Sequence, residues 1–76
     1  MMTRQEVIEF IVEECKRIFG VEPVEDYLDK MVQEFYRIKE EYVKMGFNEE
    51  EAEILAKGTV RRGMEIGKMR LDLGQL

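Results

Sequence analysis

The chain has 76 residues, enough for one compact domain and too few for two, so residues 1–76 must form a single domain around one core. It contains no serine, histidine or tryptophan, and Cys15 is its only cysteine, which excludes hydrolytic triads and a disulfide framework. A formal net charge of −5 at pH 7 disfavours nonspecific binding to nucleic acids and acidic membranes.

The charge is unevenly distributed along the chain. Residues 1–53 contain fifteen acidic and seven basic residues, whereas residues 54–76 contain two acidic and five basic ones. The C-terminal third is therefore the basic part of an acidic protein.

Composition also predicts the compartment. The polar start is unlike a secretory signal, and no apolar run approaches the ~18 residues of a membrane-spanning helix. An unpaired Cys15 on an apolar face indicates a reducing environment, so we expect a soluble cytoplasmic protein. Charged residues make up 38% of the chain and Asn48 is the only asparagine, a composition typical of proteins from hot environments.

The first predicted helix spans residues 4–19. Thr3 and Glu6 have the spacing of a capping box, in which each residue's side chain accepts a backbone N–H of the other. Gly20 supplies the left-handed residue that commonly follows a last helical turn. Phe10 is displaced toward the polar side. The apolar face gathers at helical spacing and consists of Val7, Ile8, Ile11, Val12, Cys15, Ile18 and Phe19.

The second predicted helix spans residues 23–45. Pro23 suits a first helical turn, where its missing N–H costs nothing, and Gly46 followed by Phe47 forms a stop signal. The apolar positions alternate by four and three, which makes a heptad seam three repeats long. The seam consists of Val24, Leu28, Met31, Phe35, Ile38, Tyr42 and Met45.

The third predicted helix spans residues 49–71, opens on a second capping box at Asn48 and Glu51, and leaves residues 72–76 as a frayed tail. Small residues line the centre of its apolar face. Glycine inside a helix costs up to about 1 kcal/mol relative to alanine, so the close approach of another helix is expected to offset that cost. The small-residue stripe consists of Ala52, Ala56, Thr59, Gly63 and Gly67.

These elements predict an all-α fold, a three-helix up-down bundle. The short connection at Gly46 favours an antiparallel pairing of the second and third helices. The first helix spans only about 24 Å, whereas the other two are nearer 34 Å, so one end of their apolar faces lacks cover. We therefore expect two copies to pair into a larger helical bundle.

The expected function is protein association, through a homodimer or through binding to a helix of a partner protein. The alternative is a small nucleic-acid-associated regulator that uses the basic face of the third helix. For association, the predicted interface residues are Ala52, Ala56, Thr59, Gly63, Gly67, Phe10, Leu71 and Leu73. For the alternative, the candidate anion contacts are Lys57, Arg61, Arg62 and Lys68.

One acidic group resembles half of a known metal motif. Glu49, Glu50 and Glu53 match the Glu-Glu-x-x-Glu half of the motif with which all-α nucleotide pyrophosphatases of the MazG kind hold magnesium, which implies a magnesium-dependent enzyme. The second half, Glu-x-x-Asp, is missing, since Glu65 is followed at the corresponding place by Lys68. The helix dipole stabilises acids in a first turn whatever their function. We therefore expect no catalysis, no cofactor and no metal site.

Overall fold

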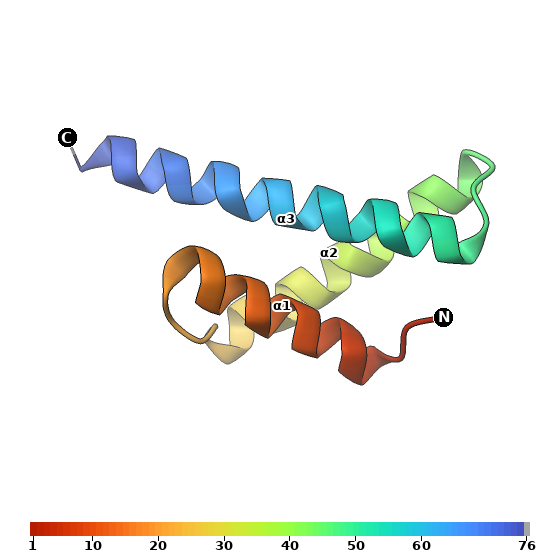
Figure 1. The fold of residues 1–76 in the computed structure, drawn as a ribbon, viewed down its shortest axis with the longest axis horizontal. Helices are drawn as coiled ribbons and strands as arrows, with labels where there is room; N and C mark the ends of the chain where they lie inside the picture. Colours follow the sequence, from red (N-terminus) through yellow and green to blue (C-terminus); the bar gives the residue numbers. More distant parts are fainter. Residues whose placement is uncertain (76) are drawn as a thin grey trace.

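The computed structural model describes residues 1–75, and these form three helices. They are α1 (Arg4–Phe19), α2 (Glu25–Lys44) and α3 (Glu49–Gly74), connected by short turns. Successive helices run in opposite directions, and α1 and α2 pack against the same side of the long α3 (Figure 1). The prediction of an all-α, three-helix up-down bundle is confirmed.

Both predicted capping boxes are present. At the start of α1, the Glu6 N–H donates to Thr3 Oγ1 over 3.2 Å and the Thr3 N–H donates to Glu6 Oε1 over 2.9 Å. At the start of α3, the same exchange joins Asn48 and Glu51 at 2.9 and 3.0 Å. Each box satisfies two backbone donors that the first turn leaves unpaired, which fixes where the helix begins.

The turn between α2 and α3 is a Schellman motif. Gly46 has a φ of +106°, its N–H donates to the Val43 carbonyl, and the Phe47 N–H donates to the Tyr42 carbonyl. The rings of Tyr42 and Phe47 meet edge to face, with centroids 5.9 Å apart. The predicted stop signal is confirmed, and it turns α3 back along α2.

Two predicted helix ends differ from the structure by two residues or more. Pro23 precedes α2 instead of lying in its first turn, because Val24 has extended backbone and acts as the N-cap, without a capping side chain. α3 continues to Gly74, three residues beyond the predicted end, and an ion pair of 2.6 Å between Lys68 and Asp72 supports its last turns. Of the predicted tail 72–76, Leu76 lies outside the described residues.

The core lies where the three helices meet. Phe35 is fully buried there, with its ring centroid 6.4 Å from that of Phe10 and 5.6 Å from that of Tyr36. The seam of α2 is buried only over its middle, since Val24 and Met45 at its ends are 72% and 71% exposed. The buried apolar residues are Val7, Ile11, Cys15, Val32, Phe35, Ala52, Ala56, Val60 and Met64.

The C-terminal third of α3 extends beyond this core. The whole of α3 has 26 residues and is about 39 Å long, whereas α1 has 16 residues and α2 has 20. Beyond Met64, no residue up to Gln75 is buried. In Figure 1 this end of α3 projects past the turn that joins α1 to α2.

Candidate functional site

An apolar groove with a volume of about 650 Å³ lies between α2 and α3. We refer to it as the α2/α3 groove. It is lined by Phe19, Tyr27, Lys30, Met31, Glu34, Ile38, Thr59, Val60, Gly63, Met64, Gly67 and Leu71. Lys30 and Glu34 are the charged residues of this lining, and Tyr27 and Thr59 carry hydroxyl groups.

The groove exists because α2 and α3 are held together at one end and diverge toward the other (Figure 1). Near the shared turn, Thr59 Oγ1 donates to the Leu55 carbonyl, so the Tyr42 hydroxyl donates to Thr59 Oγ1, over 2.9 Å. Farther along, Gly63 and Gly67 add no side chain to fill the widening space. A Cβ placed on either glycine meets no atom of another described helix within 4 Å.

The small-residue stripe therefore divides into two halves. Ala52 and Ala56 are 0% exposed and pack inside the bundle, so their prediction as contacts for a partner is wrong for the folded chain. Thr59 is half-buried and hydrogen-bonded to Tyr42. Gly63 and Gly67 lie on the wall of the groove, where no helix of this chain approaches them closely.

Apolar residues are exposed on both sides of the projecting end of α3. Leu71 is 60% exposed and lines the groove. On the flank that does not line the groove, Ile66, Met69 and Leu73 are 45%, 55% and 60% exposed. Their spacing of three and four puts them on one face of the helix, and we call them the outer patch. The prediction that Leu71 and Leu73 are available to a partner thus agrees with their exposure.

A second apolar hollow continues the groove around the end of the bundle. Its volume is about 340 Å³, and it shares Phe19, Tyr27 and Leu71 with the groove. The remaining lining comes from α1 and from the connection to α2, including Val21 and Val24, which are 63% and 72% exposed. The uncovered apolar surface is therefore larger than the groove alone.

Phe10 does not have the outward position that the sequence suggested. It packs against Phe35 and is half-buried. Lys57 Nζ and Arg61 Cζ each lie 5.6 Å from the centroid of its ring, a distance at which a cation is attracted to the ring face. Phe10 is thus covered by two basic side chains of α3, which is a reason to leave it out of the candidate interface.

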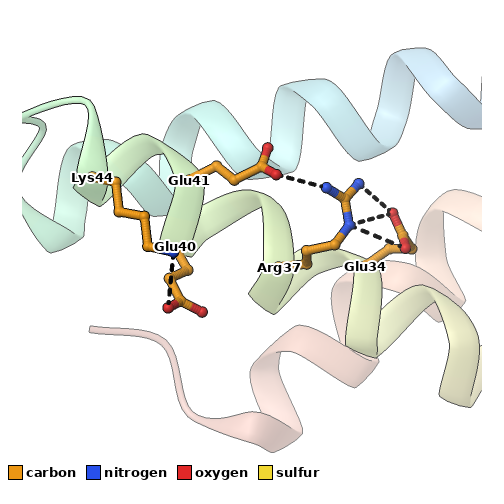
Figure 2. A network of polar contacts seen from close by, with 5 residues as sticks. All are labelled: Glu34, Arg37, Glu40, Glu41 and Lys44. Carbon is orange, nitrogen blue, oxygen red and sulfur yellow. Dashed lines mark hydrogen bonds and ion pairs between the residues drawn. The ribbon is translucent and has the colours of Figure 1, made fainter.

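An ionic network lies along the α2 side of the groove. Arg37 lies between two glutamates, with Nη2 2.7 Å from Glu34 Oε2 and Nη1 2.9 Å from Glu41 Oε1 (Figure 2). The hydrogen bonds from Arg37 hold the pKa of Glu34 below its ordinary value, so this carboxylate is charged at neutral pH. Glu40 and Lys44 form a separate pair, 3.6 Å apart. Lys30 lies in the groove lining beside Glu34, so two basic and two acidic side chains (Lys30, Arg37, Glu34 and Glu41) balance along this rim.

The predicted anion contacts are mostly engaged within the chain. Arg61 Nε donates to Glu14 Oε1 over 3.0 Å, Lys68 pairs with Asp72, and Lys57 lies over Phe10. Arg62 alone of the four has no ion pair or aromatic contact within residues 1–75. These contacts reduce the positive charge that α3 offers to a phosphate.

Sequence reasoning missed two buried acids, Glu14 and Glu53. Glu14 is 9% exposed and accepts hydrogen bonds from Arg17 of α1 and Arg61 of α3, at 2.8 and 3.0 Å. Burial raises the pKa of its carboxyl, but the two arginines outweigh burial and hold the pKa below its ordinary value. The spacing of three between Glu14 and Arg17 is the part of this contact that the sequence indicates. The contact with Arg61 could not be predicted, because Arg61 is distant in the sequence.

The carboxylate of Glu53 accepts hydrogen bonds from two groups of this chain. Its Oε2 accepts a hydrogen bond of 3.2 Å from Lys39 Nζ and one of 2.9 Å from the Met2 N–H. Glu49 and Glu50 are exposed. Within residues 1–75, no group of three or more acidic or cysteine side chains is arranged to hold a metal ion.

Comparisons with protein-family models, curated proteins and solved structures gave no match for this chain. None of the helices in the described part is both long enough and apolar enough to cross a lipid bilayer. The fold thus defines the class as a small three-helix bundle, and the α2/α3 groove is its principal candidate site.

Proposed function

We propose that this protein acts by association with another helical protein chain, and that the α2/α3 groove and the outer patch form its binding surface. The observation that carries the proposal is the groove itself, with a volume of about 650 Å³ in a chain of only 76 residues. Contiguous exposed apolar surface is costly in water and marks interaction sites.

A helix is the shape that fits this surface. The groove is bounded by two helices that diverge, and a third helix can lay its apolar face between them, as amphipathic helices do in other helix-binding grooves. Both a second copy of this chain and the helix of a different protein meet this requirement. The groove supplies few groups for chemistry, since Thr59 is hydrogen-bonded to Tyr42 and Leu55, so we propose no catalytic role.

The setting that we propose is the cytoplasm. Cys15 is 2% exposed and burial raises the pKa of its thiol, so it behaves as a small core residue without a disulfide partner. The competing function, nucleic-acid binding through α3, has less support, because Arg61 and Lys68 are already paired with Glu14 and Asp72.

The proposal is tested with a dye that fluoresces on apolar surface, such as anilinonaphthalene sulfonate, together with sedimentation of the protein. We expect dilute wild-type protein to bind the dye, and Leu71→Lys to reduce binding because it places a charge in the groove. Ile54→Lys is the matched control, since Ile54 is 70% exposed on α3 and does not line the groove. If wild-type protein neither binds the dye nor self-associates, the groove is not a docking surface and the proposal fails.

A further inference from the structure

We infer that this protein pairs with a second copy of itself through the outer patch, with the two α3 helices parallel and Glu65 of each copy beside Arg70 of the other. This inference rests on the proposed function and names one partner for it. It concerns the outer patch and not the α2/α3 groove. The repeat of α3, the charges beside that repeat and the exposed surface of the chain lead to it.

The outer patch has the spacing of a coiled-coil seam. Ile66, Met69 and Leu73 follow one another at intervals of three and four, which assigns them to heptad positions a, d and a. At 45% to 60% exposure, all three are open to a partner. Gly67 and Leu71, which line the groove, fall at positions b and f, away from this seam. A parallel helix with the same repeat can therefore pack its own a and d side chains against the patch without entering the groove.

The charges beside the seam are complementary in a parallel pair of copies. Glu65 falls at position g and Arg70 at position e of the next heptad, and these positions meet across a parallel two-stranded coiled coil. Two copies related by a two-fold axis make this contact twice, each time between opposite charges. In an antiparallel pair, e faces e and g faces g, so Arg70 would face Arg70, and Glu65 and Asp72 would face acidic residues. The pattern thus favours a second copy in parallel orientation.

The two charged side chains are available for this contact. Arg70 is exposed and makes no ion pair within the described residues. Glu65 Oε1 lies 3.0 Å from Arg17 Nη2, yet the Glu65 side chain is still 49% exposed. Lys68 and Asp72 form an ion pair with each other, so their charges balance. Arg70 is therefore the cation beside the patch that an acidic side chain of a partner can match.

Arg62 marks the N-terminal end of the proposed contact. It precedes Ile66 by four residues and so falls at position d, where the two copies of Arg62 would meet. Like charges at this point oppose association, so the apolar seam begins at Ile66. One turn earlier, Thr59 is hydrogen-bonded to Tyr42 of α2. Leucine in place of Arg62 would remove the repulsion and extend the seam by one turn.

The accessible surface of the chain is large enough for such a contact. The chain exposes 5438 Å², whereas a folded monomer of 9.1 kDa is expected to expose about 4,900 Å². The projecting end of α3 contributes to this excess, since no residue of 65–75 is buried (Figure 1). An excess of roughly 500 Å² per copy corresponds to an interface of about 1,000 Å², which is the size of weak complexes. We therefore expect the dimer to form at high micromolar concentration.

The test is a charge-swap experiment read by sedimentation equilibrium. The mass of the wild-type protein at high micromolar concentration should approach twice its monomer mass of 9.1 kDa. Arg70→Glu should weaken dimerisation about tenfold, because like charges then meet at both copies of the contact. Glu65→Lys should do the same. An equimolar mixture of the two variants should dimerise, because each contact in the mixed dimer again joins opposite charges. Arg62→Leu should strengthen dimerisation about tenfold.

Matched controls keep the outcomes separate. Arg4→Glu and Glu13→Lys make the same changes in charge at exposed positions of α1 and should leave the dimer intact. Circular dichroism checks that the helices are formed in every variant, including Glu65→Lys, which loses its contact with Arg17. A wild-type monomer that still binds the dye overturns this inference and leaves the proposed function standing with a different partner. A dimer that neither charge variant weakens, or that the mixture does not restore, overturns the parallel arrangement.

Discussion

Glu14 shows at the residue scale how a charged group can belong to the core of this small bundle. Its side chain is 11% exposed and accepts from arginines on two helices, so it ties α1 to α3. A second ion pair between Arg17 and Glu65, 3.0 Å long, runs parallel to it. Removing one partner of a buried charged pair costs more than the pair's net contribution, because the other charge stays behind.

We predict that Glu14→Gln lowers the free energy of unfolding by about 1 to 2 kcal/mol at neutral pH, less than for a fully buried pair because both arginines are partly exposed. The pKa of Glu14 is lower in the folded than in the unfolded chain, so acid protonates the unfolded state first. Its stabilising effect is complete above the ordinary carboxyl pKa of about 4.3 and is lost as the pH falls through the lowered pKa.

Urea unfolding at neutral pH and at about pH 3 measures this difference. The gap between wild type and Glu14→Gln should shrink on acidification. Glu13→Gln serves as the control, since Glu13 is exposed and makes no ion pair within the described residues. An equal loss of stability at both pH values would mean that Glu14 contributes through packing alone.

Two glycines should respond in opposite ways to the same substitution. Gly63→Ala should raise the stability of dilute, monomeric protein by roughly 0.5 to 1 kcal/mol, because a helix interior favours alanine and the added Cβ meets open space. Gly46→Ala should lower it by about 1 kcal/mol, because a φ of +106° is strained for any residue with a Cβ. Thermal unfolding followed by circular dichroism measures both. A destabilised Gly63→Ala monomer would show that another segment of the chain packs there.

At the scale of the element, the signals that sequence reading used successfully were local. A capping box needs only residues three positions apart, so the starts of α1 and α3 could be read directly. The end of α2 depends only on Gly46 and Phe47. Pro23 was misplaced because proline is compatible both with a first helical turn and with the extended segment before it, and local rules do not separate the two.

The candidate site could be predicted only in part, for a reason that is visible in α3. Ala56 and Gly63 belong to one periodic stripe, yet Ala56 is fully buried and Gly63 is exposed. Periodicity gives the face of a helix but not how far a neighbouring helix follows it. The difference comes from the divergence of α2, which depends on contacts such as Tyr42 with Thr59 that are distant in sequence.

The Asn48 cap should matter for the whole hairpin of α2 and α3. Asn48→Ala removes the acceptor for the Glu51 N–H and should cost about 1 kcal/mol of unfolding free energy. Asn48→Ser keeps an acceptor at this position and should retain most of the stability. Denaturant unfolding of the two variants measures the difference, and equal losses in both would argue against the cap as the source.

At the scale of the whole molecule, this fold is small for the length of its third helix. A core of this size rarely supplies more than about 3 to 5 kcal/mol, so such domains commonly gain stability from assembly. The groove and the outer patch are apolar surface that no segment of residues 1–75 covers, so a second chain bound there would add to the stability. Association and stability are then linked through the protein concentration.

This linkage gives a prediction for Leu73→Lys. Leu73 is 60% exposed, so lysine there should leave the isolated fold intact while placing a charge in the proposed contact. For wild type, we expect the melting temperature to rise with protein concentration, since occupancy at a hundredfold excess over Kd stabilises by about 2.7 kcal/mol. That corresponds to roughly 10 °C or more for a domain of this size.

The melting temperature of Leu73→Lys should be nearly independent of concentration and should match that of dilute wild type. Ile54→Lys, at a 70% exposed position on the first half of α3, should retain the wild-type dependence. If all three proteins melt at the same temperature at every concentration, the projecting end of α3 makes no contact with a second copy.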